Sequence, residues 1–187
     1  LLQAASHGQD IKITLDHRVQ YIAYQHLQDM FVKSGSKWGS VVVLDPRSGN
    51  VLAMVNLPSY DPNISNSRSF SKARNRAVID MYEPGSTIKP LAALAFLRNG
   101  YQPWSKINVG SGLLRVQGHT IHDEVKNLGL IDLAYVLKKS SNVGMAKFAL
   151  KISAQDILDA FSQFGLGSVS GSGFPGESAG KVSSYVK

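Results

Sequence analysis

The sequence lacks several features that define specialised classes of protein. It contains no cysteine, which excludes disulfide bonds and thiolate zinc sites and fits an oxidising compartment. It has no uninterrupted apolar run of about eighteen residues, the length at which a segment spans a bilayer. The opening residues, LLQAASHGQD, lack the charged and apolar segments of a secretion signal.

Acidic residues are also few, since 13 aspartates and glutamates stand against 20 lysines and arginines, which gives a net charge of +7. Such a balance favours nucleic acid, an anionic membrane or an anionic polymer as a partner. The basic residues are dispersed, and no signature of a nucleic-acid-binding module accompanies them. We therefore predict a basic surface and no nucleic-acid partner.

What is present is an ordinary globular composition, with 187 residues of which 43% are apolar and 18% charged. That length suffices for one domain with a proper core, or for a large piece of one. Apolar periodicity predicts a strand, a helix and a hairpin, followed by a run of helices, which indicates an α+β domain with helices packed on an antiparallel sheet.

The expected elements follow from the spacing of apolar residues and from capping signals. Asp16 is expected to cap the first helix and Gly35 to end it, and Ser153 with Asp156 to form a capping box for the last helix. The Gly/Ser-rich residues 165–180 are predicted to be a loop. We expect a strand at 11–15, a helix at 17–34, a hairpin over 40–56, a short helix within 73–82, short strands over 107–124, and helices over 130–139, 142–152 and 154–164.

The stretch MYEPGSTIKPLAALAFLRNG, residues 81–100, holds one of the five Ser-x-x-Lys patterns in the chain, so spacing alone carries no information. Only Ser86 precedes a long apolar segment, which we expect to be a helix buried in the centre of the domain. Pro90 falls within its first turn, where the N–H groups have no intrahelical partner. The five patterns start at Ser34, Ser69, Ser86, Ser178 and Ser184.

On such a helix Ser86 and Lys89 share a face, so their hydroxyl and amine can meet. Ser86 would lie at the helix N-terminus, where backbone N–H groups can hold a developing oxyanion. Desolvation lowers the pKa of Lys89, which lets it act as a neutral base for an activated serine nucleophile. The alternative is that Ser86 only caps the helix and that Lys89 extends to water.

A second polar pair stands in KKSSNVGMAKFAL, at the expected break between two helices. Ser140 and Asn142 bracket one residue there, and a hydroxyl and an amide so displayed could relay a proton and hold a substrate amide. The alternative is a plain helix break with capping residues.

Together these features resemble the transpeptidase domain of class B penicillin-binding proteins, most closely the septal, cell-division type. Ser-x-x-Lys and a Ser-x-Asn variant of Ser-Asp-Asn are the first two motifs of that group. The segment YEPGST after NRAVID resembles the septal type more than the elongation type. The resemblance covers nearly the whole chain. The matching text is GSVVVLDPRSGNVLAMVNLPSYDPN, RNRAVIDMYEPGSTIKP, KKSSNVGMAKFAL, and FGLG with GE in the tail.

The resemblance implies an α+β penicillin-recognising (β-lactamase-like) fold and a peptidoglycan D,D-transpeptidase that β-lactams inhibit. Ser86 would attack the D-Ala-D-Ala carbonyl of a stem peptide, and an amine of a neighbouring stem peptide would resolve the acyl-enzyme. Lys89 would be the general base, Ser140 a proton relay to the leaving amine, and Asn142 a partner of the substrate amide. No metal or organic cofactor is implied.

The resemblance also implies a setting for the chain. Residues 1–187 are expected to be a partial transpeptidase domain, without the membrane anchor, the pedestal and the C-terminal third motif. No Lys-Thr-Gly, Lys-Ser-Gly or Arg-Thr-Gly follows Asn142, and Ser141 stands where class A β-lactamases have aspartate. The whole protein would sit in the inner membrane with this domain in the periplasm, beside other division proteins and a membrane-bound glycosyltransferase.

Other interpretations stay open at this point. β-Lactamases and D,D-carboxypeptidases share the same serine chemistry but deacylate with water, and a non-catalytic binding module of the division machinery is an alternative of another class. His119 and His122 with Asp123 suggest a metal site, but no further ligand stands at a telling spacing, so we expect none.

Overall fold

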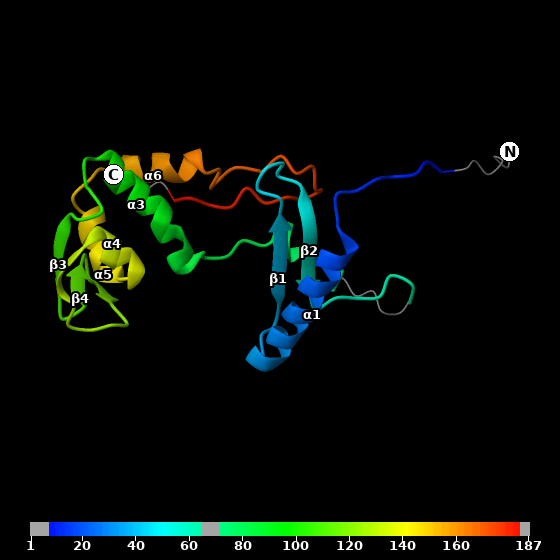
Figure 1. The fold of residues 1–187 in the computed structure, drawn as a ribbon, viewed down its shortest axis with the longest axis horizontal. Helices are drawn as coiled ribbons and strands as arrows, with labels where there is room; N and C mark the ends of the chain where they lie inside the picture. The colour runs from blue at the N-terminus through cyan, green and yellow to red at the C-terminus, as the bar shows by residue number, and fades with distance from the viewer. Residues whose placement is uncertain (1–7, 65–71, 184–187) are drawn as a thin grey trace. The chain divides into compact units, whose positions relative to one another are not determined.

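In the computed structural model, the first part of the chain is a helix laid on a two-stranded hairpin (Figure 1). Asp16 caps α1 (His17–Ser34) by accepting from two backbone N–H groups, and Gly35, at φ 62°, ends it. β1 (Gly39–Leu44) pairs antiparallel with β2 (Val51–Leu57), so the predicted helix and hairpin are confirmed. The structure describes residues 8–64 and 72–183, and its contacts divide the chain into two compact units, residues 1–80 and 81–187.

The strand expected at residues 11–15 is wrong. Ile11 and Ile13 are 86% and 64% exposed, and no ladder forms. Only the Thr14 hydroxyl and the Asp16 N–H reach backbone carbonyls at the start of β2. Further along β2, the Gln20 side chain occupies the N–H and C=O of Met54, at 2.8 and 2.9 Å, so a neighbouring strand has no partner there.

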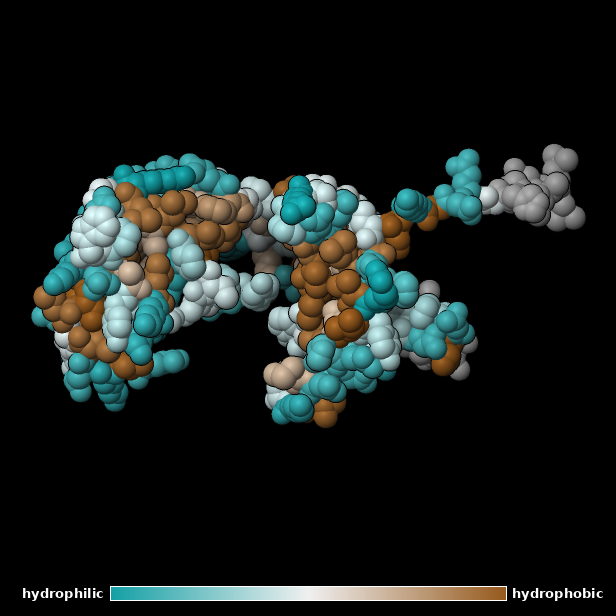
Figure 2. Space-filling model, in the orientation of Figure 1, coloured by the Kyte–Doolittle hydropathy of each residue, from teal (hydrophilic) through white to brown (hydrophobic). Residues whose placement is uncertain are grey.

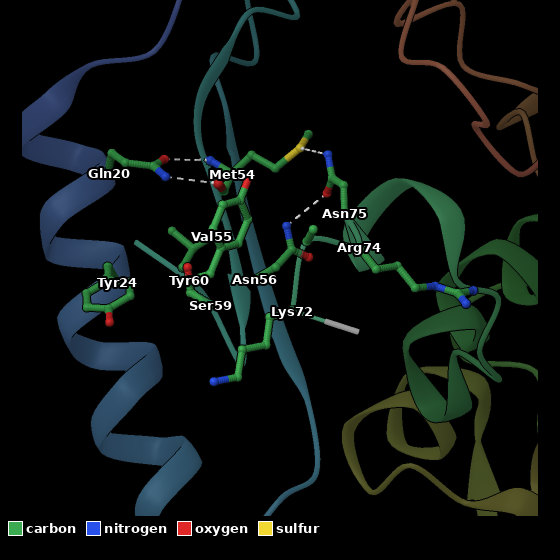
Figure 3. A pocket seen from close by; sticks show the side chains of 11 residues that line it. Gln20, Tyr24, Met54, Val55, Asn56, Ser59, Tyr60, Lys72, Arg74 and Asn75 are labelled. Carbon is green, nitrogen blue, oxygen red and sulfur yellow. Dashed lines mark hydrogen bonds between the residues drawn. The ribbon is translucent and has the colours of Figure 1, made fainter. Parts of the chain in front are cut away.

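Amide side chains fasten the short helix α2 (Arg76–Ile79), which lies within the predicted 73–82, to the hairpin. The Asn56 Oδ1 atom accepts from the Ala77 N–H at 2.8 Å, and its Nδ2 atom donates to Asn75 at 2.8 Å. Asn75 in turn reaches the Met54 sulfur at 3.3 Å (Figure 3). Figure 2 shows apolar side chains at the surface over this hairpin, where Val42 is 43% exposed.

The second unit is built around aromatic rings of α3 and α5. Phe96 and Phe148 stack at 5.6 Å between ring centroids, and Tyr101 meets Phe148 edge-on at 5.2 Å. The elements are η2 (Gly85–Ile88), α3 (Lys89–Arg98), β3 (Lys106–Gly110), β4 (Leu113–Val116), β5 (His119–His122), β6 (Gly129–Asp132), α4 (Leu133–Lys138), α5 (Asn142–Ala149) and α6 (Ala154–Gln163).

Two expectations for these helices need correction. Residues 130–132 belong to β6 and not to a helix, because Ile131 pairs with Ile107 of β3 and is buried there. Asp132 then starts α4 by accepting from the Tyr135 N–H. The helix after Ser86 is buried on one side only, since Leu97 is 40% exposed.

The remaining predictions for the second unit mostly hold. Ser153 caps α6, but through the N–H of Gln155 and not through the Asp156 N–H that a capping box requires. Residues 165–180 form neither helix nor strand, as predicted. The described strands form three antiparallel pairs, β1–β2, β3–β6 and β4–β5, and no helix in the described ranges has the length and apolarity to cross a membrane.

Candidate active site

Ser86 lies in η2, a single 3-10 turn that leads directly into α3. Gly85 adopts φ 60°, which glycine tolerates, and so starts the turn. Lys89 is the first residue of α3, with φ −58° and ψ −38°, although the proline after it disfavours that conformation. Pro90 costs no intrahelical hydrogen bond because it occupies the first turn, as predicted.

The Ser86 side chain does not cap the helix. Neither η2 nor α3 has a side-chain cap, and the Thr87 hydroxyl donates to the Pro84 carbonyl at 2.5 Å. Ser86 is exposed, and its hydroxyl accepts from the Ser140 Oγ atom at 3.0 Å. The capping alternative for Ser86 is therefore wrong, and its oxygen points to the Ser140 turn.

Lys89 does not extend to water either. Its Nζ atom donates to the Ser140 carbonyl at 2.5 Å, to Ser140 Oγ at 2.9 Å and to Asn142 Oδ1 at 2.6 Å. Among the described residues no hydrogen bond joins Lys89 directly to Ser86, contrary to the expected contact. Ser140 stands between them and connects the amine to the Ser86 hydroxyl.

The pKa of Lys89 is lowered from its usual value of 10.5. Burial of the ammonium is the main cause, and the negative charges of Asp123 and Glu124 oppose it. The direction agrees with the desolvation argument made from the sequence.

The second motif lies in the turn between α4 and α5. Ser140 has φ 54°, an uncommon conformation for a residue with a Cβ atom. The predicted break between two helices is present, but Ser141, and neither Ser140 nor Asn142, caps α5. The helices approach closely here: a Cβ atom at Gly144 would lie 2.6 Å from Val136.

His122, the last residue of β5, and Asp123, which follows it, also belong to this site. The His122 carbonyl accepts from Asn142 Nδ2 at 2.9 Å, and the Asp123 carboxylate accepts from Ser141 Oγ at 2.8 Å and from the Val143 N–H at 2.9 Å. Within residues 8–64 and 72–183 no group of three acidic or histidine side chains could hold a metal ion. The sequence did not reveal that Asp123 accepts a hydrogen bond from Ser141, because the two residues are 18 positions apart.

The other Ser-x-x-Lys patterns do not form such a cluster where the structure describes them. Ser34 ends α1, and Ser178 lies in the C-terminal loop, whereas Ser69 and Ser184 lie outside the described residues. A Lys-Ser-Gly triplet does occur at 33–35, but it ends α1 and does not lie on a strand. A pocket of about 200 Å³ beside β2, lined by Tyr24, Ser59 and Lys72 among others, contains none of the predicted site residues (Figure 3).

An α+β fold that joins a serine at a helix entrance, a lysine one turn on and a Ser-x-Asn turn is typical of serine acyltransferases that react with penicillin. The chain belongs to the family described as "Penicillin binding protein transpeptidase domain", whose model matches residues 39–187. The predicted family and fold are confirmed.

The relatives carry peptidoglycan names. The chain is 40% identical over 190 residues to "Probable peptidoglycan D,D-transpeptidase PbpC" of Pseudomonas aeruginosa, covering 100% of this chain and 33% of that protein. It is 36% identical over 171 residues to "Peptidoglycan D,D-transpeptidase FtsI" of Escherichia coli, covering 91% of this chain and 29% of that protein. The chain thus spans about a third of the length of these relatives.

Two solved structures are similar to the fold. One, titled as a peptidoglycan glycosyltransferase from Burkholderia ambifaria, has a TM-score of 0.79 and 33% identity, over 92% of this chain and 50% of that one. The other, the transpeptidase (TP) domain of Burkholderia pseudomallei penicillin-binding protein 3, has a TM-score of 0.75 and 30% identity, over 95% of this chain and 49% of that one.

Proposed function

We propose that this chain carries the acylating residues of a peptidoglycan D,D-transpeptidase that cross-links stem peptides during septal cell-wall synthesis and is a target of β-lactams. The observation that carries the proposal is the hydrogen-bonded path from Lys89 through Ser140 to Ser86. Such a path joins a nucleophile to a base whose pKa is lowered by burial. The names of the relatives support the substrate class.

The contacts of Lys89 suggest how the base works. A lysine ammonium has three N–H donors, and it finds three acceptors here. Two of them, the Ser140 carbonyl and Asn142 Oδ1, are only acceptors. Ser140 Oγ is a hydroxyl, so this contact alone can reverse its direction when Lys89 becomes neutral and gains a lone pair.

In the reactive state the hydrogen bonds then run from Ser86 to Ser140 to Lys89. As the Ser86 oxygen attacks the D-Ala-D-Ala carbonyl, its proton passes to Ser140 Oγ and the Ser140 proton passes to Lys89 Nζ. Lys89 then returns the proton through Ser140 Oγ to the nitrogen of the scissile amide, whose bond to the carbonyl carbon breaks, so that the terminal D-alanine leaves as an amine and the acyl group stays on Ser86. The amine of a second stem peptide then attacks the acyl carbonyl and gives a proton through Ser140 to Lys89; the new amide bond forms, the ester bond to Ser86 breaks, and the proton returns to the Ser86 oxygen.

Asn142 is proposed to hold the substrate amide. Its Oδ1 atom accepts from Lys89 and one Nδ2 proton goes to the His122 carbonyl. The second Nδ2 proton serves the substrate carbonyl, because an amide nitrogen has two donors. The backbone N–H of Ser86, at the start of α3, is proposed as one oxyanion donor.

We further propose that residues 1–187 are a partial transpeptidase domain within a longer protein, since the relatives extend well beyond the matched part. The remaining part would supply a third motif, a pedestal and an inner-membrane anchor that leaves this domain in the periplasm. Other division proteins and a membrane-bound glycosyltransferase are the expected partners, and no cofactor is required.

The test is labelling of the full-length protein with a fluorescent penicillin, followed by mass mapping of the labelled peptide. We expect the adduct on Ser86 and its loss in Ser86→Ala. Ser178→Ala is the matched control, because it removes another Ser-x-x-Lys serine of the same unit and should label normally. An adduct that turns over rapidly in water would indicate a β-lactamase or carboxypeptidase. An unlabelled protein that still binds division partners would indicate a binding module.

A further inference from the structure

Two polar residues are buried beside the candidate active site, Asp123 at 5% and Ser141 at 2% exposure. The mechanism proposed above uses neither of them. A buried carboxylate is costly unless hydrogen bonds compensate it. Asp123 has these bonds, one from the Ser141 hydroxyl at 2.8 Å and one from the Val143 N–H at 2.9 Å.

Together the two residues form a divided cap for α5. The hydroxyl of Ser141 accepts from the N–H of Gly144, the third helical residue, at 2.8 Å, whereas Asp123 accepts from the N–H of the second. In α1, Asp16 alone accepts from the corresponding second and third N–H groups. The start of α5 is thus fixed to the end of β5 by a carboxylate from a distant part of the chain.

The residues on either side of Ser141 provide all the acceptors of Lys89. Ser140 contributes its carbonyl and its hydroxyl, and Asn142 contributes its amide oxygen. Ser140 also has φ 54°, which side chains with a Cβ atom disfavour, so its surroundings must hold it there. Any shift of Ser141 therefore moves the link between Lys89 and Ser86.

We propose that Asp123 is a positioning residue for acylation, which with Ser141 caps α5 and so holds Ser140 and Asn142 against Lys89. Class A β-lactamases carry an aspartate in the middle of this motif. Here the middle residue is Ser141, and a carboxylate reaches the same helix end from the segment after β5. This inference rests on the proposed function.

The test measures penicillin acylation of the full-length protein at several concentrations, which separates the binding constant from the acylation rate constant. Asp123→Ala should lower the rate constant about 10²-fold, the usual cost of misplacing a catalytic group by about 1 Å, and change binding little. A residue that only stabilises the fold would reduce the labelled fraction and leave the rate constant of the folded molecules unchanged.

Two further variants keep the proposal testable if Asp123→Ala does not fold. Asp123→Asn keeps an oxygen for the Val143 N–H and a donor for Ser141 Oγ, so it should lose far less activity than the alanine variant. The exchange Asp123→Ser with Ser141→Asp should recover much of the rate, because a carboxylate at position 141 can accept from both N–H groups, as Asp16 does. Ser153→Ala, which removes the cap of α6, is the matched control and should acylate normally.

The outcomes are separable. If penicillin does not acylate the wild-type protein, the proposed function itself is refuted. A wild-type protein that reacts while Asp123→Ala reacts equally fast overturns the positioning role alone. Equal losses in the alanine and asparagine variants, with no recovery in the exchange, also overturn it, because variants that retain or restore the cap of α5 would then not retain or restore the rate.

Discussion

Ser140 offers the sharpest test of the proton path, since it is the residue between Lys89 and Ser86. Ser140→Ala removes the oxygen that lies 2.9 Å from Lys89 Nζ and 3.0 Å from Ser86 Oγ. The Ser140 carbonyl and Asn142 Oδ1 still hold the amine in place. Only the link to the nucleophile is lost. Because positioned acid–base groups contribute about 10²–10⁴ in rate, we expect acylation to slow by that factor.

Ser140→Gly provides the matched comparison. It removes the same hydroxyl but also relieves the positive φ of residue 140, which disfavours a Cβ atom by about 1 kcal/mol. The glycine variant should therefore unfold at a higher temperature than the alanine variant and yet acylate equally slowly. Stopped-flow labelling with a fluorescent penicillin and thermal unfolding measure the two effects.

A Ser140→Ala protein that acylates within about threefold of the wild type would refute the path, because a lost relay costs far more than that. Lys89 would then have to reach Ser86 directly. A rate restored only in the glycine variant would also contradict the reasoning, since it would point to backbone strain and not to the hydroxyl.

Four more predictions concern Lys89, its pH dependence, the nearby Glu124 and the isolated chain. Lys89→Arg should lower acylation by orders of magnitude, because a guanidinium does not lose its proton in a protein, and near-normal labelling would remove Lys89 as the base. Since neutral Lys89 is the reactive form and burial lowers its pKa, the acylation rate should rise with pH through a midpoint below 10.5. The charge of Glu124 raises that pKa, so Glu124→Gln should move the midpoint to lower pH, and an upward movement would contradict the assignment. On the proposal that residues 1–187 are part of a larger domain, this chain alone should acylate slowly and dissolve poorly, because the rest of the domain would supply a second oxyanion donor, whose loss costs about 10²–10³ in rate, and a further strand, whose loss exposes a sheet edge. Labelling of the isolated chain at the rate of the full-length protein would show that the first two motifs suffice.

Much of the fold could be predicted from local patterns. Asp16 and Gly35 mark the two ends of α1, and the Pro/Gly turn joins two apolar runs into the β1–β2 hairpin. The strand predicted at residues 11–15 from apolar alternation was wrong, because the alternation does not show whether a neighbouring strand is available for pairing. Residues 130–132 failed for the opposite reason, because a partner strand 22 to 26 positions earlier in the chain, β3, overrode their helical pattern.

The residues of the candidate site could be predicted, but the hydrogen bonds that connect them could not. Ser86, Lys89, Ser140 and Asn142 do meet, since each lies in a recognisable local signal. That Ser140 would lie between the serine and the lysine depends on the tertiary approach of η2 to the α4–α5 turn. The contact of Asp123 with the start of α5 could not be predicted, because its hydrogen-bond partners are distant in the sequence. The nearby His119 and His122 suggested a metal site instead.

The Gln20 side chain forms hydrogen bonds with the N–H and the C=O of Met54, so one edge of the hairpin is occupied at this point (Figure 3). A carboxamide in this position imitates a single residue of a neighbouring strand and closes that stretch of the β2 edge. Strands that join a larger sheet are thereby directed to the β1 side, and edge-to-edge association of two copies through β2 is discouraged. One glutamine on a helix thus limits which edge of the hairpin can accept a further strand, and does so without contributing a strand of its own.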